Sequence, residues 1–463
     1  MTQFLPEALA GRAKGPARTV AGIMLLLLLS LPTLVFAAAG DLDPTFGLVV
    51  TDFGSEEDAG EFAILPDGKL LVVGAAGSVR GFLVRYNSDG SLDQTFGDDG
   101  RTHSQLQGCI STEYNELAVQ SDQKIVVAGV VLCESARSND VVLARHNEDG
   151  SLDRSFGNDG WVVTDLAGSH DRVGELAILP DGKLLVVGTA HSGEHNRVAL
   201  ARYNSDGSPD MTFDGDGRAF AGVDGYQYSN GEALALQPDG KLVTAGWVSD
   251  ENPRGFLLAR FNGDGTLDTT FGTGGVTVVD FGGAGGSAWS IAIQADGTII
   301  AAGNKNSPDG PDFALARFDG EGRLDPSFGD AGTVTTNIEL GDTIFDLTIQ
   351  PDGKLVVAGS TGYSGYHYTG RSATVARYTA DGLLDPTFGQ AGIRVLEIPN
   401  KEYALALDAN LQPDGKLVVG GGAWDPCRSC FNTGDIWLAR LETGLERPPG
   451  SWTISLPLVA RGD

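Results

Sequence analysis

Short apolar runs separated by Asp-Gly turns recur along the chain. In the segment 64–74, Ile-Leu precedes Pro-Asp-Gly-Lys and Leu-Leu-Val-Val follows it. An Asp-Gly pair between two apolar runs is a strong β-hairpin signal, because such tight turns need residues that accept a positive φ angle. The turn aspartate recurs with steps of 55 to 62 residues, as Asp67, Asp122, Asp181, Asp239, Asp296, Asp352 and Asp414. The pattern predicts a repeat of nearly sixty residues that contains a strand–turn–strand unit.

Two further signatures follow each hairpin in a fixed order. The first is an apolar strand that ends in arginine, which recurs as Arg85, Arg145, Arg202, Arg260, Arg317, Arg377 and Arg440. The second is Asn-x-Asp-Gly-x-Leu-Asp-x-Thr/Ser-Phe-Gly, whose phenylalanine recurs as Phe46, Phe96, Phe156, Phe213, Phe271, Phe328 and Phe388. Each repeat thus predicts strand A before Pro-Asp-Gly, strand B after the lysine, strand C ending in arginine and strand D after Phe-Gly. Four-stranded units in series are typical of a β-propeller.

The phase of the repeat predicts how the two ends of the chain meet. Residues 42–47 carry a lone copy of the last signature and precede a D strand near Val49–Asp52, whereas no D strand follows Arg440. We therefore predict an all-β, seven-bladed β-propeller over residues 40–442, with four antiparallel strands per blade. The N-terminal D strand should complete the C-terminal blade by pairing with strand C at Ile436–Arg440, which leaves no open sheet edge.

The sequence resembles the delta-60 repeat family, a bacterial propeller-like repeat. The resemblance rests on the Gln-Pro-Asp-Gly-Lys, Leu-Ala-Arg and Leu-Asp-x-Thr-Phe-Gly motifs and spans roughly Asp41 to Leu441. It implies an exported or surface-associated protein, and it carries no established activity to transfer.

Both ends of the chain predict segments outside the propeller. A basic stretch precedes an apolar run over 20–36, and Ala37-Ala-Ala39 supplies small residues for cleavage, so residues 1–39 are expected to be a signal peptide. The alternative is an uncleaved anchor, although the run is short for a membrane span. Residues 443–463 form a Pro-containing linker and an apolar tail. We expect a secreted or cell-surface protein with no integral membrane span in its mature form, and the resemblance implies a bacterial source.

The chain is strongly acidic, with 61 acidic against 32 basic residues and a net charge of −29. Such a surface repels phosphate backbones, which argues against nucleic acid as a partner. It fits a soluble protein in an open environment that binds cations. We also expect the protein to be a monomer.

Acidic residues stand six positions before the turn aspartate in five of the seven repeats, as Glu61, Glu116, Glu175, Asp346 and Asp408. They begin the innermost strand, so the symmetry of a propeller should gather them near one mouth of the central channel. There they could bind Ca²⁺ or another divalent cation, which is the one cofactor that the sequence suggests. Alternatively, they accept hydrogen bonds from backbone or arginine between blades, since buried carboxylates are usually paired.

Two other motifs could bind metal. Asn262, Asp264 and Asp268 copy the later part of a calcium loop, but an arginine takes the first ligand position, so a turn held by its own side chains explains them as well. His170-Asp171 and His191-x-x-Glu194-His195 fall on predicted loops of the third blade and could suit Zn²⁺. Their spacing matches no established metal motif, and solvated loop histidines are the alternative.

The four cysteines predict two disulfides that staple long loops, as is usual for an even count in an exported protein. Cys109 and Cys133 fall on two loops of the second blade, and Cys427 and Cys430 share one loop of the seventh. A redox Cys-x-x-Cys is not expected, because such a motif normally opens a helix.

Aromatic residues gather on the face that carries the B–C and D–A loops, as Tyr226, Tyr228, Trp247, Tyr363, Tyr366, Tyr368 and Trp424. The opposite face carries near-identical Asp-Gly turns. One uniform face and one variable, Tyr-rich face indicate a scaffold that presents a recognition surface. The alternative is that these rings pack locally under the loops.

No catalytic constellation is evident, and the fold alone does not choose a function. We expect a non-enzymatic binding or surface-scaffold module that recognises a protein or glycan through its B–C/D–A loop face. The alternative is an exported hydrolase or lyase with a divalent cation at the channel mouth, and a third is a purely structural envelope protein.

Overall fold

The computed structural model describes residues 37–54, 57–77, 79–134, 138–250, 255–363, 370–425 and 434–445. From Ala37 onward the chain forms one compact unit. Every regular element in the described ranges is a β-strand, and none of them contains a helix that could cross a membrane. The predicted signal peptide up to residue 36, and the tail from residue 446, lie outside these ranges.

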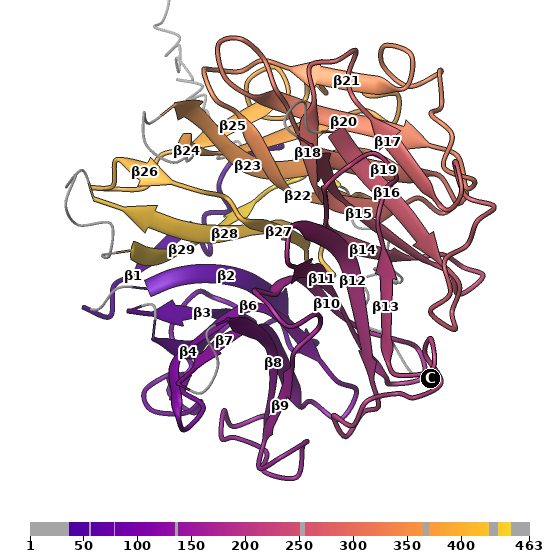
Figure 1. Cartoon of the computed structure of the whole chain (residues 1–463). Coiled ribbons are helices and arrows are strands. Elements are labelled where there is room, and N and C mark those ends of the chain that lie inside the picture. The colour runs from indigo at the N-terminus through magenta and orange to yellow at the C-terminus, as the bar shows by residue number, and fades with distance from the viewer. Residues whose placement is uncertain are drawn as a thin grey trace, which may run out of the picture. The chain divides into compact units, whose positions relative to one another are not determined.

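The strands follow one another in antiparallel groups, mostly of four, which we call units (Figure 1). A single parallel bridge, Asn196 opposite Tyr228, joins the third and fourth units into one eight-stranded sheet. The first unit contains β2 (Glu57–Ile64), β3 (Leu70–Ala76), β4 (Arg80–Tyr86) and β5 (Arg101–Ser104). The second contains β6 (Cys109–Val119), β7 (Ile125–Cys133), β8 (Asn139–His146) and β9 (Trp161–Thr164). The third contains β10 (Arg172–Ile178), β11 (Leu184–Ser192), β12 (His195–Tyr203) and β13 (Arg218–Ala221). The fourth contains β14 (Tyr228–Leu236), β15 (Leu242–Ser249), β16 (Gly255–Phe261) and β17 (Val276–Val279).

The later units repeat this order. The fifth contains β18 (Gly286–Ile293), β19 (Ile299–Lys305), β20 (Asp312–Phe318) and β21 (Thr333–Thr336). The sixth contains β22 (Thr343–Ile349), β23 (Leu355–Tyr363), β24 (Gly370–Tyr378) and β25 (Ile393–Leu396). The seventh contains β26 (Tyr403–Ala404), β27 (Asp408–Leu411), β28 (Leu417–Trp424) and β29 (Gly434–Leu441), together with β1 (Leu48–Thr51).

Strand A of the seventh unit differs from the expectation of one continuous strand near Leu405. It is split into β26 and β27, both of which pair with β28. The intervening backbone stays bonded to β28, because the N–H groups of Leu405 and Leu407 donate to Gly422 and Gly420. The other six A strands make the same change of register more sharply, through a β-bulge.

The A–B hairpins are held by the turn chemistry that their sequence predicts. In every unit the turn aspartate accepts the backbone N–H two residues later, at 2.9–3.3 Å. The residue after the aspartate has a positive φ angle, for example Gly68 at 84°. In the second unit Gln123 takes this place with φ 68°, which costs a non-glycine residue backbone strain.

The hydrophobic core lies between neighbouring units rather than inside any one of them. Among the described residues there are seven apolar clusters, and each combines side chains of two adjacent units. Leu83 of the first unit and Val127 of the second share one cluster, for example. Another combines Phe62 and Phe82 of the first unit with Ile436 and Leu438 of the seventh.

A buried arginine at the end of each C strand ties each unit to the next. In the third unit, the Nε atom of Arg202 donates to Asp210 at 2.7 Å, and its guanidinium lies 4.4 Å from the ring centre of Phe213. Its Nη1 atom donates to the backbone carbonyl of Gly263 in the fourth unit. The same three contacts recur at Arg85, Arg145, Arg260, Arg317, Arg377 and Arg440. We call this set the arginine clasp.

The aspartate of the clasp is ionised by its surroundings. Burial opposes the charge of Asp210, but hydrogen bonds from Thr212, Lys183 and Arg202 outweigh that cost and hold its pKa well below the ordinary range. Lys183 approaches the carboxylate to 2.9 Å. The clasp therefore joins two cations and one anion in a nearly dry site, where such pairs are far less screened than at the surface.

The two ends of the chain meet in the seventh unit. Strand β1 pairs antiparallel with β29, with Leu48 opposite Ala439 and Thr51 opposite Ile436, as the phase of the repeat predicts. The clasp of this unit is built from both ends, because Arg440 bonds Asp43 near the start of the described residues. Lys416 approaches the same carboxylate to 2.9 Å.

Replacing a clasp arginine should cost far more stability than replacing an exposed one. Arg202→Met leaves Asp210 with Lys183 as its only cation and leaves the Gly263 carbonyl without its donor, so we expect a loss of roughly 3 kcal/mol. Arg154→Met is the control, because Arg154 forms an exposed ion pair with Asp159; it should cost about 1 kcal/mol or less. Urea unfolding measures both variants, and similar losses in the two would contradict the role given to the clasp.

Candidate binding site at the central channel

A channel of about 810 Å³ is lined by strand A of every unit, which in the seventh unit is its second part. These are β2, β6, β10, β14, β18, β22 and β27, which lie around the middle of the view in Figure 1. The five acids that the sequence singles out all line it, namely Glu61, Glu116, Glu175, Asp346 and Asp408. We call them the ring acids. The structure thus brings them to one place, as the symmetry argument predicts.

A β-bulge in strand A places four of the ring acids, and the break between β26 and β27 places the fifth, Asp408. In β10, for example, the register shifts between Val173 and Glu175, so two residues of β10 oppose one residue of β11. A bulge re-aims the side chains around it. As a result, the ring acid and the residue just before it both line the channel, whereas strict alternation would send them to opposite faces.

Four of the five ring acids accept a hydrogen bond from the backbone of the next unit. The bonds are Leu117 N–H to Glu61 (2.9 Å), Leu234 N–H to Glu175, Ala409 N–H to Asp346 (3.0 Å) and Phe62 N–H to Asp408 (3.1 Å). Ser290 takes the same role in the fifth unit, where it accepts from Leu347 at 3.1 Å. The interpretation that these acids bond backbone between neighbouring repeats is confirmed for these four. A cation at the ring stays a prediction.

The pKa values of the ring acids lie above the ordinary range for carboxyl groups. Burial raises the pKa of Glu61 to about 7 and that of Glu175 to about 8. Burial and the nearby charges of Glu61 and Glu175 raise the pKa of Glu116 well above its usual value. A hydrogen bond between Glu116 and Glu61 lowers the pKa of Glu61 and raises that of Glu116. Asp408 stands in the same relation to Asp346.

The residue just before each ring position makes the channel asymmetric. Around the seven units these residues are Gly60, Asn115, Gly174, Glu232, Trp289, Phe345 and Leu407. The first three leave room or offer an amide, whereas the last three form an apolar wall on consecutive units. The ring of Trp289 is fixed by a 3.0 Å hydrogen bond from its Nε1 atom to Asn304. An apolar wall facing small residues and carboxylates is the usual chemistry of a ligand site.

The aromatic residues expected on the loop face are half-buried where the structure describes them. Tyr226 packs against the core cluster between the third and fourth units, which favours the local-packing alternative for that ring. Trp247 lies next to the channel, because its Nε1 atom donates to Glu232 at 2.9 Å. Tyr228 begins β14, and Trp424 ends β28. Tyr366, Tyr368 and the side chain of Tyr363 lie outside the described residues.

Residues of the calcium-like motif bond one another. Asp264 accepts the backbone N–H of Thr266 at 3.0 Å, and Asn262 donates to the hydroxyl of the same threonine at 3.0 Å. Asp268 belongs to the clasp of Arg260. The side chains of this segment therefore stabilise its own turn, as the alternative interpretation expects.

The histidines of the third unit lie partly in strands, which corrects the expectation of loops. His191 lies in β11 opposite Asn196, and His195 begins β12 opposite Ser192, on the two sides of the turn that ends the β11–β12 hairpin. His170 accepts the backbone N–H of Asn139 at 3.2 Å. Together with Glu194, these side chains form no metal-ligand set among the described residues.

The first pair of cysteines also lies in strands rather than in loops. Cys109 begins β6 and Cys133 ends β7, because this hairpin is longer than its counterparts, and the two residues are register partners joined by a disulfide. Cys427 and Cys430 lie outside the described residues, so their pairing stays a prediction.

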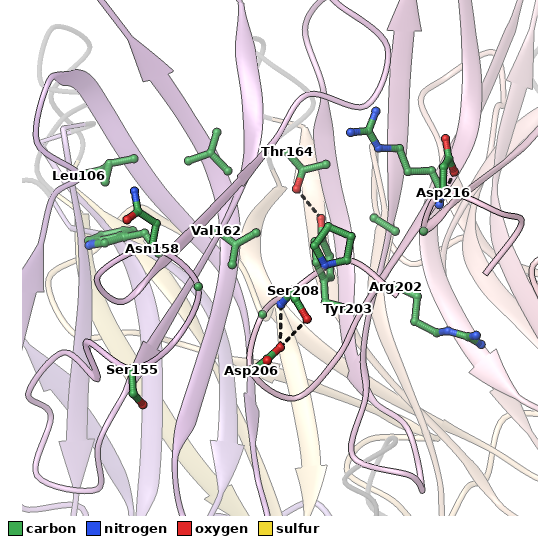
Figure 2. Close-up of a pocket in the computed structure, with 18 residues that line it drawn as sticks. Leu106, Ser155, Asn158, Val162, Thr164, Arg202, Tyr203, Asp206, Ser208 and Asp216 are labelled. Carbon is green, nitrogen blue, oxygen red and sulfur yellow. Dashed lines mark hydrogen bonds between the residues drawn. The ribbon is translucent and has the colours of Figure 1, made fainter. Parts of the chain in front are cut away.

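A second groove of about 640 Å³ runs between the outer strands of the second and third units (Figure 2). Several of its polar side chains already have partners. Tyr203 donates to Thr164 at 2.7 Å, and Ser208 donates to Asp206 at 2.6 Å, as the dashed lines in Figure 2 show. The groove therefore offers fewer polar groups to a ligand than the channel does.

Sequence reasoning missed Trp289, Phe345 and Glu232. All three stand directly before the ring residue of their repeat. An alignment of the repeats shows this shared position, but only the bulge explains why it lines the channel.

Six segments of the chain match the family model described as Domain of unknown function (DUF5122) beta-propeller. They are residues 65–96, 120–156, 179–213, 237–271, 294–328 and 350–388. The chain is a β-propeller repeat protein. The narrower resemblance to delta-60 repeats stays a prediction. No curated protein sequence matches the chain.

Solved structures similar to this propeller have diverse descriptions. One is the polysaccharide lyase Uly1, at 10% identity and TM-score 0.46, with 88% of this chain and 100% of the lyase covered. Another is YCF48 bound to D1 peptide, at 12% identity and TM-score 0.45, with 90% and 100% covered. A third is the aldose sugar dehydrogenase from Streptomyces coelicolor, at 16% identity and TM-score 0.39, with 70% and 93% covered. Likeness at this level transfers no activity.

The protonated channel should make stability fall as the pH rises. The pKa of Glu175 lies at about 8 in the folded protein against 4.5 for the ordinary side chain, so its protonated form favours folding at low pH. This contribution is lost as the pH rises through the interval between those values, with a magnitude on the order of a few kcal/mol. Glu175→Gln keeps an acceptor for Leu234 N–H and removes the titration, so its stability should fall less between pH 5 and pH 8.

Urea unfolding at a series of pH values measures this difference. Glu194→Gln serves as the control, because Glu194 is exposed in a hairpin turn and should change nothing. Parallel pH profiles for the parent protein and Glu175→Gln would show that the channel does not hold this carboxyl in its protonated form.

Proposed function

We propose that this propeller is a non-enzymatic binding scaffold that recognises a protein or glycan through its B–C/D–A loop face, centred on the channel. The observation that carries the proposal is the asymmetric lining, in which Trp289 and Phe345 face a side built from Gly60 and Gly174. Aromatic planes beside carboxylates suit both sugar rings and peptide side chains. The ring acids, in contrast, are largely engaged with the backbone of the next unit.

We further propose that the seven units form a closed seven-bladed ring over residues 40–442. Three observations support closure at the seam. Strand β1 pairs with β29, the clasp of Arg440 reaches the backbone carbonyl of Ser88 in the first unit, and Asp408 accepts the N–H of Phe62. The pairing of β1 with β29 repeats the pairing of strands C and D within the other units. The other two contacts repeat, between the seventh and first units, contacts that join consecutive units elsewhere.

An exported or cell-surface monomer is the setting we propose for this scaffold. The support comes from the signal-like sequence of residues 1–39, the acidic composition and the Cys109–Cys133 disulfide, since disulfides persist in oxidising compartments.

One observation favours the alternative of an exported hydrolase or lyase. Glu61 and Glu116 are hydrogen-bonded inside the channel and both have a raised pKa, and a protonated carboxyl next to a carboxylate is the arrangement of an acid–base pair. Glu61 also accepts Leu117 N–H at 2.9 Å, which ties this pair to the inter-unit structure.

Binding to glycan and peptide arrays tests the proposal. Trp289→Ala and Phe345→Ala remove the apolar wall and should weaken any captured ligand roughly tenfold or more each, as expected for aromatic residues at the centre of a site. Leu383→Ser is the control, because Leu383 is 67% exposed on a C–D turn and should leave binding unchanged.

Two outcomes would contradict the proposal. Ligands captured equally by the parent protein and both wall variants would place recognition elsewhere. Turnover of a captured glycan that is abolished by Glu116→Gln would establish the enzymatic alternative instead.

A further inference from the structure

Three aspartates converge where the second unit meets the third. Asp140 lies in β8, Asp165 directly follows β9, and Asp171 lies in the loop that leads to β10. One carboxylate oxygen from each lies within 4.8 Å of the other two, and the described residues contain no second group of this kind. Oxygens bound to one Ca²⁺ at about 2.4 Å each are separated by at most about 4.8 Å. The spacing is therefore that of ligands around a single ion.

One of these carboxylates is buried with half of its bonding capacity unused. Asp171 is 0% exposed. Its Oδ2 atom accepts the backbone N–H of Leu166 at 2.7 Å, whereas its Oδ1 atom is buried and has no hydrogen-bond partner. A buried carboxylate oxygen without a donor is costly, because ionised groups are rarely buried unless they are paired or coordinate a metal.

The loop position of Asp171 has a structural role in several units that needs no cation. Thr112 and Ser229 occupy the same position, and each accepts a loop N–H with its hydroxyl. The bond between Asp171 and Leu166 fulfils this role. A hydroxyl is therefore sufficient for the loop, and the second oxygen of Asp171 calls for another explanation.

In the fifth unit an amide replaces one of the three carboxylates at the corresponding site. There Asp312, Asn337 and Asp342 take the places of Asp140, Asp165 and Asp171. The amide of Asn337 donates to Asp312 at 2.7 Å, and the carboxylate of Asp342 accepts N–H groups of Ile338 and Glu339. Both carboxylates are satisfied by donors of the chain itself.

The seventh unit meets the same need with a cation. Asp435 occupies the strand position of Asp140, and Lys401 approaches it to 2.8 Å. In the second unit Asp140 instead faces two further carboxylates. Arg218 exerts an electrostatic effect on Asp171, but the two side chains form no ion pair within 4.0 Å in the described part of the chain. A positive charge is thus supplied by the protein in one unit and is lacking in the other.

We propose that Asp140, Asp165 and Asp171 bind a Ca²⁺ ion. Three carboxylates without nitrogen or sulfur ligands suit a hard cation, and the exposed side of Asp165 leaves room for the water ligands that complete its coordination. His170 is not needed as a ligand, since its Nδ1 atom accepts Asn139 N–H.

The ion would fix the loop over 165–171 at the edge of the channel. Asp171 and Asn139 both contribute to the channel lining, so the site borders the surface that we propose for ligand binding. The inference does not depend on that function, because it rests only on the carboxylates and on their counterparts in the other units.

Calcium titration of the full chain tests the site directly. After dialysis against EDTA, isothermal titration at constant ionic strength should give one Ca²⁺ per chain with a Kd of roughly 10⁻⁴–10⁻³ M, the range of extracellular calcium modules. The Tm should rise by a few degrees with saturating Ca²⁺, as linkage requires for an ion that binds the folded state. Mg²⁺ should bind more weakly, because it demands stricter geometry.

Asp165→Asn identifies the site, because it copies the arrangement that the fifth unit already uses. This variant should weaken Ca²⁺ binding at least tenfold and keep its Tm in EDTA. The control is Asp280→Asn, at the same repeat position of the fourth unit, where Gly255 stands in place of Asp140. It should bind Ca²⁺ like the parent protein.

The inference is overturned if the parent protein shows no saturable heat and no Tm shift, or if Asp165→Asn binds Ca²⁺ unchanged. The latter result would assign the ion to the ring acids or to general charge. Loss of ligand capture by the Trp289→Ala variant with intact Ca²⁺ binding would show that the two proposals stand or fall separately.

Discussion

Each unit of this propeller is joined to the next by an arginine that the fold buries. The guanidinium of Arg202 pairs with Asp210, stacks on Phe213 and donates to a backbone carbonyl of the following unit. A buried cation is tolerated only where its charge and its donors are all satisfied. The backbone carbonyl that satisfies this arginine in part belongs to the next unit, so neither unit reaches its stable form alone. The seven apolar clusters between units have the same property.

This dependence on neighbours shapes the channel as well. The bulge in strand A turns a carboxylate inward, and the backbone N–H of the adjacent unit holds it there, as Leu117 holds Glu61 at 2.9 Å. Because the carboxylates are gathered in a small volume, burial and mutual repulsion keep several of them protonated. What remains free to differ is the residue just before each ring position, and it is there that Trp289 and Phe345 build an apolar wall.

The repeat allowed much of the fold to be predicted, since turn aspartates, clasp arginines and their phenylalanines recur at fixed spacing. The pairing of β1 with β29 followed from the phase of the repeat alone. The details of the sites did not follow, because they depend on register. A bulge cannot be predicted from composition, so Trp289 was not recognised as a channel residue. Asp140 and Asp165 are 25 residues apart in the sequence and meet only because β8 and β9 are paired.

We propose that β1 is held in the seventh unit as stably as strand D is held in a unit made of contiguous residues. Hydrogen exchange of β1 against β9, the equivalent outer strand of the second unit, tests this most directly. The amides of Leu48–Thr51 that bond β29 should exchange as slowly as their counterparts in Trp161–Thr164, in both cases through opening of the whole ring. Rapid exchange of β1 while β9 stays protected would mean that the ends only lie together, and that the ring is open at the seam.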